Sequence, residues 1–413
     1  MAAEQEKLDL SPENLPDHEE RESVEHPVTV NIGPAHPATH GTLRLKAVLD
    51  GEVIVSAKAE IGYLHRGFEI QCEQVNYQQV IPYTDRLNYL SACMNNTCWT
   101  KAVEKLLGIE DQVPERAIYI RVIVDELSRI ADHLVCNGIG ALDLGGLTNF
   151  WYTFYPREKI YDILEKLSGA RLTNAYTRIG GVVYDIYPGF EDDLKDAFKE
   201  LDRGLGGMLK LLQKNRIFND RVRDVGVVSA EDALAWGWTG PCLRASGVAY
   251  DVRKDQPYYH YDEFDWEVVV GEKGDCWDRF FVRVEEIRQS MRIIEQAVAR
   301  IPDGPVMISD PKIALPPKEE VYNSIEGLIN HFKLIFEGVR PPAGEVYSCT
   351  EAANGELGFY IVSDGSANPY RVKVRAPSFM HFQAIEQIAK GHYIADAIAI
   401  LGSLNIIAGE LDR

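Results

Sequence analysis

The stretch PERAIYIRVIVDELSRIADHLVCNG, residues 114–138, decides the fold class of this 413-residue chain. Its apolar residues recur at helical spacing, and Leu127, Ile130 and Leu134 fall on one face. Pro114 suits the first turn of a helix, where its missing N–H costs no hydrogen bond, and Asn137-Gly138 is a pair that ends helices. We therefore predict a long helix from Pro114 to Asn137-Gly138, within a bundle of long helices.

Helical periodicity continues on both sides of this segment. One helix is predicted to begin near Asp85, as the N-cap after Pro82, and to end near Gly108. Further long helices are predicted over residues 149–168, 190–212, 276–300 and 317–336, and two more fill 378–402. Ser229 opens a short capped helix, and the rest of 229–275 is irregular, as functional or interface-forming segments often are.

Two short regions alternate with the period of strands instead. Val28, Val30 and Ile32 begin a series of runs that ends near Gly62, and Asp50-Gly51 marks a turn between the last two runs. Residues 355–377 predict a hairpin around Asp364-Gly365. The fold class is therefore α+β, with a small N-terminal antiparallel sheet, a central long-helix bundle, and a C-terminal hairpin with helices.

No Ser/Gly-rich linker divides the chain, which favours one interlocked domain over residues 26–413. We expect 26–70 to be β-rich, 71–228 to be a helical bundle, 229–275 to be irregular, and 276–413 to hold helices and the hairpin. Residues 1–25 are acidic and lack the features of a signal or transit peptide. They predict a disordered or docking arm.

Charge and cysteine usage exclude several classes of function. The net charge of −20 and the absence of polybasic stretches argue against nucleic-acid binding. The longest apolar stretch near the C-terminus is interrupted by Asp396, Ser403 and Asn405, so it does not predict a membrane span. The seven cysteines are scattered without a CxxC pair, which predicts small buried side chains in a reducing compartment and no iron-sulfur cluster. Carboxylate pairs such as Glu191-Asp192 and Glu285-Glu286 predict charged helix surfaces.

The loop GPAHPATHG, residues 33–41, carries the most distinctive polar pattern. Gly33-Pro34 and Pro37 exclude a helix there, so His36 and His40 are not a helical pair of metal ligands. Histidine can donate a proton near neutral pH, tyrosine only to a strongly basic acceptor, and a carboxylate beside a histidine raises its pKa. A substrate that is reduced and then protonated at two separated oxygens would suit the polar side chains of this and two other stretches, which are His36, His40, Tyr83, Asp85, Arg86, Tyr89 and Asp143. A structural role for the loop histidine and a core position for Tyr89 are the alternatives.

Several ordered motifs resemble the D-subunit family of bacterial complex I, the proton-pumping NADH:quinone oxidoreductase. They include NIGPAHPATHGTLRL, IGYLHRGFE, YTDRLNYLSA, ELSRIADHL, LDLGGLT, TGPCLRASG, PYRVKVRAPSF and the terminal GELDR, and they cover roughly residues 27–413. The resemblance implies a fold like that of the nickel-iron hydrogenase large subunit. It also implies a peripheral-arm protein on the cytoplasmic side of the inner membrane that binds quinone, coupled to proton translocation and electron transport.

Site residues follow from the same resemblance. It implies that His40 and Tyr89 contact the quinone headgroup, that Asp143 partners His40, and that His36, Thr39, Gly41 and Arg66 lie near the cavity or the cluster interface. The expected partners are the cluster-bearing B subunit, the C and I subunits, and the H subunit of the membrane arm. The last iron-sulfur cluster is expected on the neighbouring protein, and no metal on this chain. Where the family has RLDY, this chain has RLNY, which puts in doubt a carboxylate role at Asn88.

Three other classes compete with this interpretation. Hydrogenase large subunits bind nickel and iron through two cysteine pairs, and the corresponding regions YTDRLNYL and SLNIIAGELDR contain no cysteine. A structural scaffold would have the same pocket without quinone chemistry. A binding module is favoured only by the acidic irregular segment 250–275.

Overall fold

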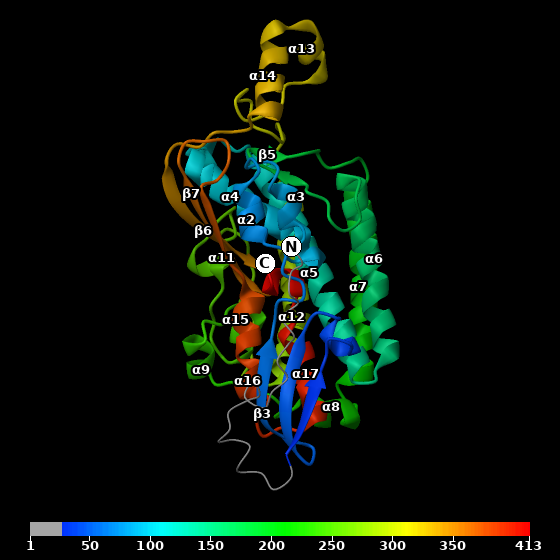
Figure 1. The fold of residues 1–413 in the computed structure, drawn as a ribbon. Coiled ribbons are helices and arrows are strands. Elements are labelled where there is room, and N and C mark those ends of the chain that lie inside the picture. The colour runs from blue at the N-terminus through cyan, green and yellow to red at the C-terminus, as the bar shows by residue number, and fades with distance from the viewer. Residues whose placement is uncertain (1–26) are drawn as a thin grey trace, which may run out of the picture.

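A computed structural model describes residues 27–413, and the predicted acidic arm, residues 1–25, lies outside the described residues. The described chain mixes helices with two small three-stranded sheets, and long helices fill its centre (Figure 1). The predicted α+β class is confirmed.

The N-terminal sheet is built from three consecutive antiparallel strands, as predicted. Strands β1 (Val28–Ile32), β2 (Arg44–Asp50) and β3 (Val53–Glu60) pair in that order. The turn between β2 and β3 holds Gly51 at a φ of 61°, a conformation that glycine adopts without strain. Loop 33–41 therefore leaves the sheet at the end of β1 and returns to it at β2.

Four long helices pack beside one another to form the bundle: α5 (Glu115–Asp143), α6 (Leu147–Ser168), α7 (Phe190–Leu212) and α12 (Cys276–Arg300) (Figure 1). Three of them match the predicted ranges closely. Helix α5, however, runs past its predicted end. A Cβ atom at Gly138 would lie 2.1 Å from Thr153 Oγ1 of α6, so this glycine permits a close helix contact and does not stop the helix.

The helix predicted to begin at Asp85 is instead three pieces: α3 (Ile81–Thr84), the 3₁₀ turn η3 (Tyr89–Ser91) and α4 (Ala92–Leu107). Asp85 is buried and accepts hydrogen bonds from Asn96 Nδ2 and Ala175 N, so it is not an N-cap. Asn88 caps η3 instead by accepting from Leu90 N at 3.1 Å. Tyr89 therefore lies on a 3₁₀ turn rather than within a long helix.

The second sheet contains β6 (Gly344–Ala352), β7 (Gly355–Ser363) and β8 (Arg371–Arg375) in that order. The predicted hairpin of β7 and β8 is confirmed. Strand β6 escaped prediction because five successive residues at its end are buried, which hides the alternation that marks a half-buried strand. The sheet packs against α4.

The helix predicted over 317–336 is divided into α13 (Lys318–Asn323) and α14 (Ile325–Phe336). Ser324 divides it, because its hydroxyl oxygen accepts from Gly327 N and caps α14. The two helices project from one end of the molecule and expose apolar side chains, among them Tyr322, Ile325, Phe332 and Phe336 (Figure 1).

Short helices complete the chain. Ser229 caps α9, as predicted. The structure has three helices where two were predicted over 378–402, and α18 follows them. The chain turns at Gly391, and beside this turn Ile54 N of β3 donates a hydrogen bond to His392 O. The short helices are α2 (Phe68–Glu73), α8 (Arg216–Val222), α9 (Ala230–Ala235), α10 (Gly240–Ala245), α11 (Val252–Asp255), α15 (Pro377–Gln383), α16 (Ile385–Ile388), α17 (Ile394–Leu404) and α18 (Ala408–Leu411). Two further 3₁₀ turns are η2 (Pro37–Thr39) and η4 (Glu110–Gln112). Two strands of two residues each are β4 (Thr177–Arg178) and β5 (Gly181–Val182). No helix among residues 27–413 combines the length and the apolar character needed to cross a bilayer.

The core contains charge as well as apolar side chains. Glu286 was predicted on the surface, but it is 3% exposed and lies 2.8 Å from both Arg244 Nε and His133 Nε2. A carboxylate can be buried when its charge is paired and its oxygens are hydrogen-bonded, and sequence pattern cannot reveal such partners. Glu191, Asp192 and Glu285 do lie at the surface, and the prediction that the seven cysteines are buried is confirmed.

Candidate active site

Loop 33–41 separates its two histidines. The chain makes one 3₁₀ turn over Pro37–Thr39, where no helix was expected. His36 caps this turn, because its Nδ1 atom accepts from Ala38 N at 3.2 Å. His40 ends the turn in the left-handed conformation at a φ of 53°. The two side chains therefore have different surroundings, and only His40 lines the cavity described below.

The start of the loop lies against Leu43, the residue before β2. Gly33 has a φ of 87°, and a Cβ atom there would lie 2.1 Å from Leu43 O. Thr39 is buried, and its hydroxyl donates to His36 O at 2.8 Å. Only glycine allows this approach, so the loop and the position of His40 depend on Gly33.

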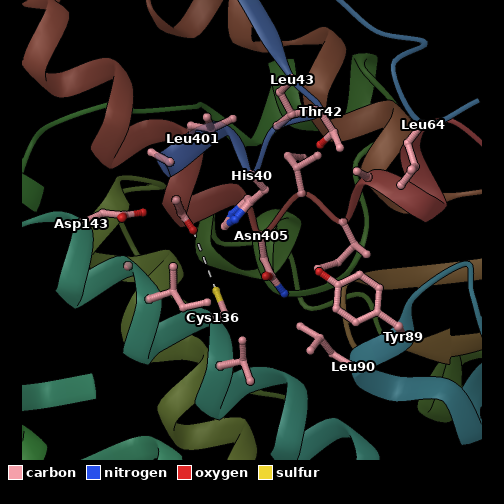
Figure 2. A pocket seen from close by; sticks show the side chains of 18 of the residues that line it. His40, Thr42, Leu43, Leu64, Tyr89, Leu90, Cys136, Asp143, Leu401 and Asn405 are labelled. Atoms are coloured by element: carbon pink, nitrogen blue, oxygen red, sulfur yellow. Dashed lines mark hydrogen bonds between the residues drawn. The ribbon is translucent and has the colours of Figure 1, made fainter. Parts of the chain in front are cut away.

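A cavity of about 440 Å³ lies between the loop, η3, the ends of α5 and α17, and the side of α6. His40 and Tyr89 enter it from opposite sides, and Asp143 lies beyond His40 at the end of α5 (Figure 2). Most of the remaining wall is apolar. The other lining residues are Ala38, Thr42, Leu43, Leu64, Leu90, Val135, Cys136, Ile139, Gly140, Phe154, Arg157, Leu401, Gly402, Asn405, Ile406, Ile407 and Ala408.

The remaining predicted site residues lie outside this wall. Thr39 is buried below the loop, Gly41 follows His40 with a φ of 75°, and His36 caps the 3₁₀ turn. Arg66 is exposed, and its Nη2 atom donates to Arg86 O at 3.0 Å. The structure thus brings His40, Tyr89 and Asp143 to one cavity, and the other four predicted residues are not part of its lining.

The cavity shifts the pKa of two of these groups. Burial raises the pKa of Asp143, and the nearby His40 and His36 counteract part of that rise. No hydrogen bond joins Asp143 to His40 among the described residues. Burial and the charge of Asp132 raise the pKa of Tyr89, and Arg157 opposes them. The phenol therefore stays protonated until a strongly basic acceptor is present.

Arg157 is a cavity residue that sequence reasoning missed. Its guanidinium lies over the rings of Phe154 and Tyr161, at 4.8 and 4.4 Å, and its Nη2 atom donates to the Tyr161 hydroxyl at 3.0 Å. The three residues share one face of α6, at i, i+3 and i+7, and this spacing could have marked Arg157 as more than a surface charge.

Metal ligands are not grouped in the part of the chain that the structure describes. No set of three or more His, Cys, Asp or Glu side chains there could hold a metal ion. Burial raises the pKa of Cys136, the one cysteine at the cavity, to about 12, so its thiol stays protonated.

Comparison with known proteins decides the family. Residues 143–413 match the family described as the 49 kDa subunit of respiratory-chain NADH dehydrogenase. The chain belongs to this family. Within it, the chain is 52% identical over 389 residues to the D subunit of NADH-quinone oxidoreductase from Myxococcus xanthus, covering 94% of this chain and 92% of that protein.

Other relatives are similarly close. The D subunit of Geobacter sulfurreducens is 51% identical over 386 residues, covering 94% of this chain and 98% of the relative. The C/D subunit of NADH-quinone oxidoreductase from Bdellovibrio bacteriovorus is 57% identical over 384 residues, covering 93% of this chain and 68% of the relative. The resemblance to the D subunits is therefore confirmed over most of the chain.

One departure from the family motif has a structural counterpart. Asn88 stands where the motif RLDY has its aspartate, and its Nδ2 atom donates to Asp132 Oδ2 at 2.8 Å. Asp132 lies on α5, and both residues are fully buried. A carboxylate is thus present beside Tyr89 in this member of the family, but α5 supplies it.

Proposed function

We propose that this chain is a peripheral-arm subunit of respiratory complex I and forms its quinone-headgroup site. The observation that carries this proposal is the cavity itself, where an imidazole and a phenol enter a largely apolar space from opposite sides (Figure 2). A quinone headgroup is a flat apolar ring with an oxygen at each end. It suits an apolar cavity with one proton donor at each side.

The reaction at this site is the two-electron reduction of quinone to hydroquinone. Each carbonyl oxygen gains one proton and becomes a hydroxyl, and an iron-sulfur cluster on the neighbouring protein would supply the two electrons. Tyr89 donates its phenolic proton to one oxygen, and protonated His40 donates to the other. The raised pKa of Tyr89 restricts its donation to an oxygen made strongly basic by the incoming electrons.

Asp143 acts through His40 in this proposal. The attraction between the two side chains, which also counteracts part of the rise in the pKa of Asp143, would orient His40 as a donor. After His40 has given up its proton, the attraction to Asp143 weakens. His40 belongs to a loop without regular structure apart from one 3₁₀ turn, so this change in charge could shift loop 33–41 and begin the coupling to proton translocation.

The exposure of the site supports a multisubunit setting. His40 is exposed and Tyr89 is 41% exposed, so this chain alone does not close the cavity. We propose that the cluster-bearing B subunit completes the wall, that the C and I subunits lie in the same arm, and that the H subunit of the membrane arm adjoins it. The chain would then lie on the cytoplasmic side of the bacterial inner membrane, attached through the complex.

Substitution of the two donors in the assembled complex tests the proposal. Tyr89→Phe and His40→Ala should each lower NADH:quinone turnover by roughly 10²-fold or more, the contribution of a positioned proton donor. Ferricyanide reduction by NADH should persist, because that acceptor does not need the quinone cavity. Tyr184→Phe, at an exposed tyrosine outside the cavity, is the matched control. Unchanged quinone turnover in both donor variants would refute the proposal.

A further inference from the structure

A buried carboxylate lies behind the cavity wall, and no cation neutralises it through an ion pair among residues 27–413. Asp132 is fully buried. Its Oδ2 atom accepts from Asn88 Nδ2 at 2.8 Å, and its Oδ1 atom accepts from Asn405 Nδ2 at 2.7 Å. Asn88 precedes Tyr89, and Asn405 lines the cavity. One carboxylate therefore holds a side-chain amide on each side of it.

These hydrogen bonds fix which way the Asn405 amide points. The Nδ2 atom of Asn405 donates to Asp132 Oδ1, so the NH₂ group of the amide faces the carboxylate. The second N–H of that group donates to Asn354 Oδ1 at 2.6 Å, which uses both of its hydrogens. The carbonyl oxygen of Asn405 accepts no hydrogen bond within the described residues.

The carboxylate itself cannot turn to release Asn405. Asn88 holds its other oxygen, and the orientation of Asn88 is fixed in turn because its Oδ1 atom accepts from Leu90 N at 3.1 Å. Figure 2 places Asn405 between the His40 ring and the Tyr89 ring. The free carbonyl oxygen therefore belongs to the part of the cavity that lies between the two proposed proton donors.

A hydrogen-bond acceptor at this place distinguishes the two redox forms of the substrate. The oxygens of a quinone only accept hydrogen bonds, so a carbonyl oxygen facing them gains nothing. The hydroxyl groups of a hydroquinone also donate. We propose that Asp132 is a positioning residue that holds the Asn405 carbonyl oxygen as an acceptor for hydroquinone, so that the cavity binds the reduced form in preference to the quinone.

This inference rests on the proposed quinone site and adds a consequence to it. Preferential binding of the reduced form favours the transfer of electrons onto bound quinone, because it stabilises the product at the site. The same preference retains the product, so hydroquinone should inhibit turnover competitively.

Asp132→Asn in the intact complex is the direct test. The replacement has the same shape, but its amide can donate, which allows Asn405 to turn and present its NH₂ group to the cavity. The measured quantity is the ratio of the inhibition constant of a short-chain hydroquinone to the KM of the matching quinone. We expect this ratio to rise about fivefold, the effect of one net hydrogen bond. Asn405→Leu, which removes the acceptor, should raise it similarly.

A ratio measured on one variant is insensitive to the fraction of complex that assembles, so a purely structural role of Asp132 would not move it. Asp125→Asn is the matched control. Asp125 is buried on the same helix, is absent from the cavity wall and accepts from Thr97 Oγ1 at 3.0 Å; its substitution should leave the ratio unchanged.

The outcomes separate this inference from the proposed function. An unchanged ratio in Asp132→Asn and Asn405→Leu, with turnover still lost in Tyr89→Phe, overturns the role of Asp132 and retains the quinone site. Quinone kinetics that respond to none of these three substitutions overturn both.

Discussion

Replacing Glu126 by glutamine removes the negative charge from a buried group of ion pairs that Glu126 forms with Arg129 and Arg253. Glu126 lies on α5 and is fully buried. One of its oxygens accepts from Arg129 Nε at 3.1 Å and Ser290 Oγ at 2.6 Å. The other accepts from Arg253 Nη1 at 3.1 Å and Tyr261 Oη at 2.8 Å. A glutamine side chain has one NH₂ group, so it cannot accept at both ends and leaves two of these donors without a partner.

The size of the effect follows from the pKa of Glu126. Burial opposes its ionisation, but Arg129 and Arg253 outweigh burial and lower its pKa from 4.5 in the unfolded chain to about 2 in the folded one. That difference corresponds to about 3 kcal/mol of folding free energy at neutral pH. Breaking one partner of a buried ion pair typically costs about 3–5 kcal/mol. Both arguments predict that Glu126→Gln lowers the free energy of unfolding by about 3 kcal/mol.

Urea unfolding of the purified chain, followed by circular dichroism at pH 7, measures this loss. Urea is preferable to guanidinium because it does not screen charges. Glu285→Gln on α12 is the control, because Glu285 is a half-exposed carboxylate paired with Arg288; its loss should cost less than about 1 kcal/mol.

Acid titration of the same proteins provides a second test. The contribution of Glu126 is complete above pH 4.5 and is lost as the pH falls toward 2, because its folded pKa lies below its unfolded one. The wild-type chain should therefore lose stability over this range more steeply than Glu126→Gln. A variant within 1 kcal/mol of the wild type, or with the same acid dependence, would show that these ion pairs do not stabilise the fold in this way.

Two further predictions concern helix packing and a buried histidine. Gly204→Ala on α7 should lower the melting temperature, because its Cβ atom would lie 2.4 Å from Tyr152 O of α6. Gly206→Ala on the same helix is the control: its Cβ atom meets nothing within 4 Å, and it should raise the free energy of unfolding by up to about 1 kcal/mol. Equal shifts of the two variants in thermal unfolding would contradict this packing. Burial lowers the pKa of His381 from 6.5 to about 3, and the charge of Glu410 opposes this shift. Below pH 6.5 His381 therefore binds a proton in the unfolded chain but stays neutral in the folded chain until the pH approaches 3. The free energy of unfolding should then fall by about 1.4 kcal/mol per pH unit between pH 6.5 and 3 from this group, and His381→Gln should flatten that slope in urea titrations; an unaltered slope would rule it out.

Much of the fold could be predicted from the sequence, because long helices and half-buried strands leave periodic apolar patterns. Two of the errors share one physical cause. Gly138 looks like the end of a helix until Thr153 of α6 is seen to occupy the space beside it. Asp85 looks like an N-cap, but its carboxylate is used by Asn96 and by Ala175, which is 90 positions away along the chain. In each case a tertiary partner, which no local pattern encodes, determines the role.

The candidate site was less accessible to sequence reasoning than the fold. His40, Tyr89 and Asp143 were singled out through their motifs, and composition and spacing alone gave them no priority over other polar residues. Asn405 was noted only as a polar interruption in an apolar stretch. Its importance lies in two hydrogen bonds, to Asp132 and Asn354, that span 273 and 51 positions.

The contact between Gly138 and Thr153 also determines which parts of the cavity wall can move. At Gly138 the side chain of Thr153 on α6 occupies the space beside α5, and α5 continues without a break to Asp143. The walls supplied by α5 and α6 are therefore packed directly against each other at this contact. If the cavity must widen to admit a bulky ring, the movement has to come from loop 33–41 and from the segment after α17, which form the parts of its wall outside the long helices.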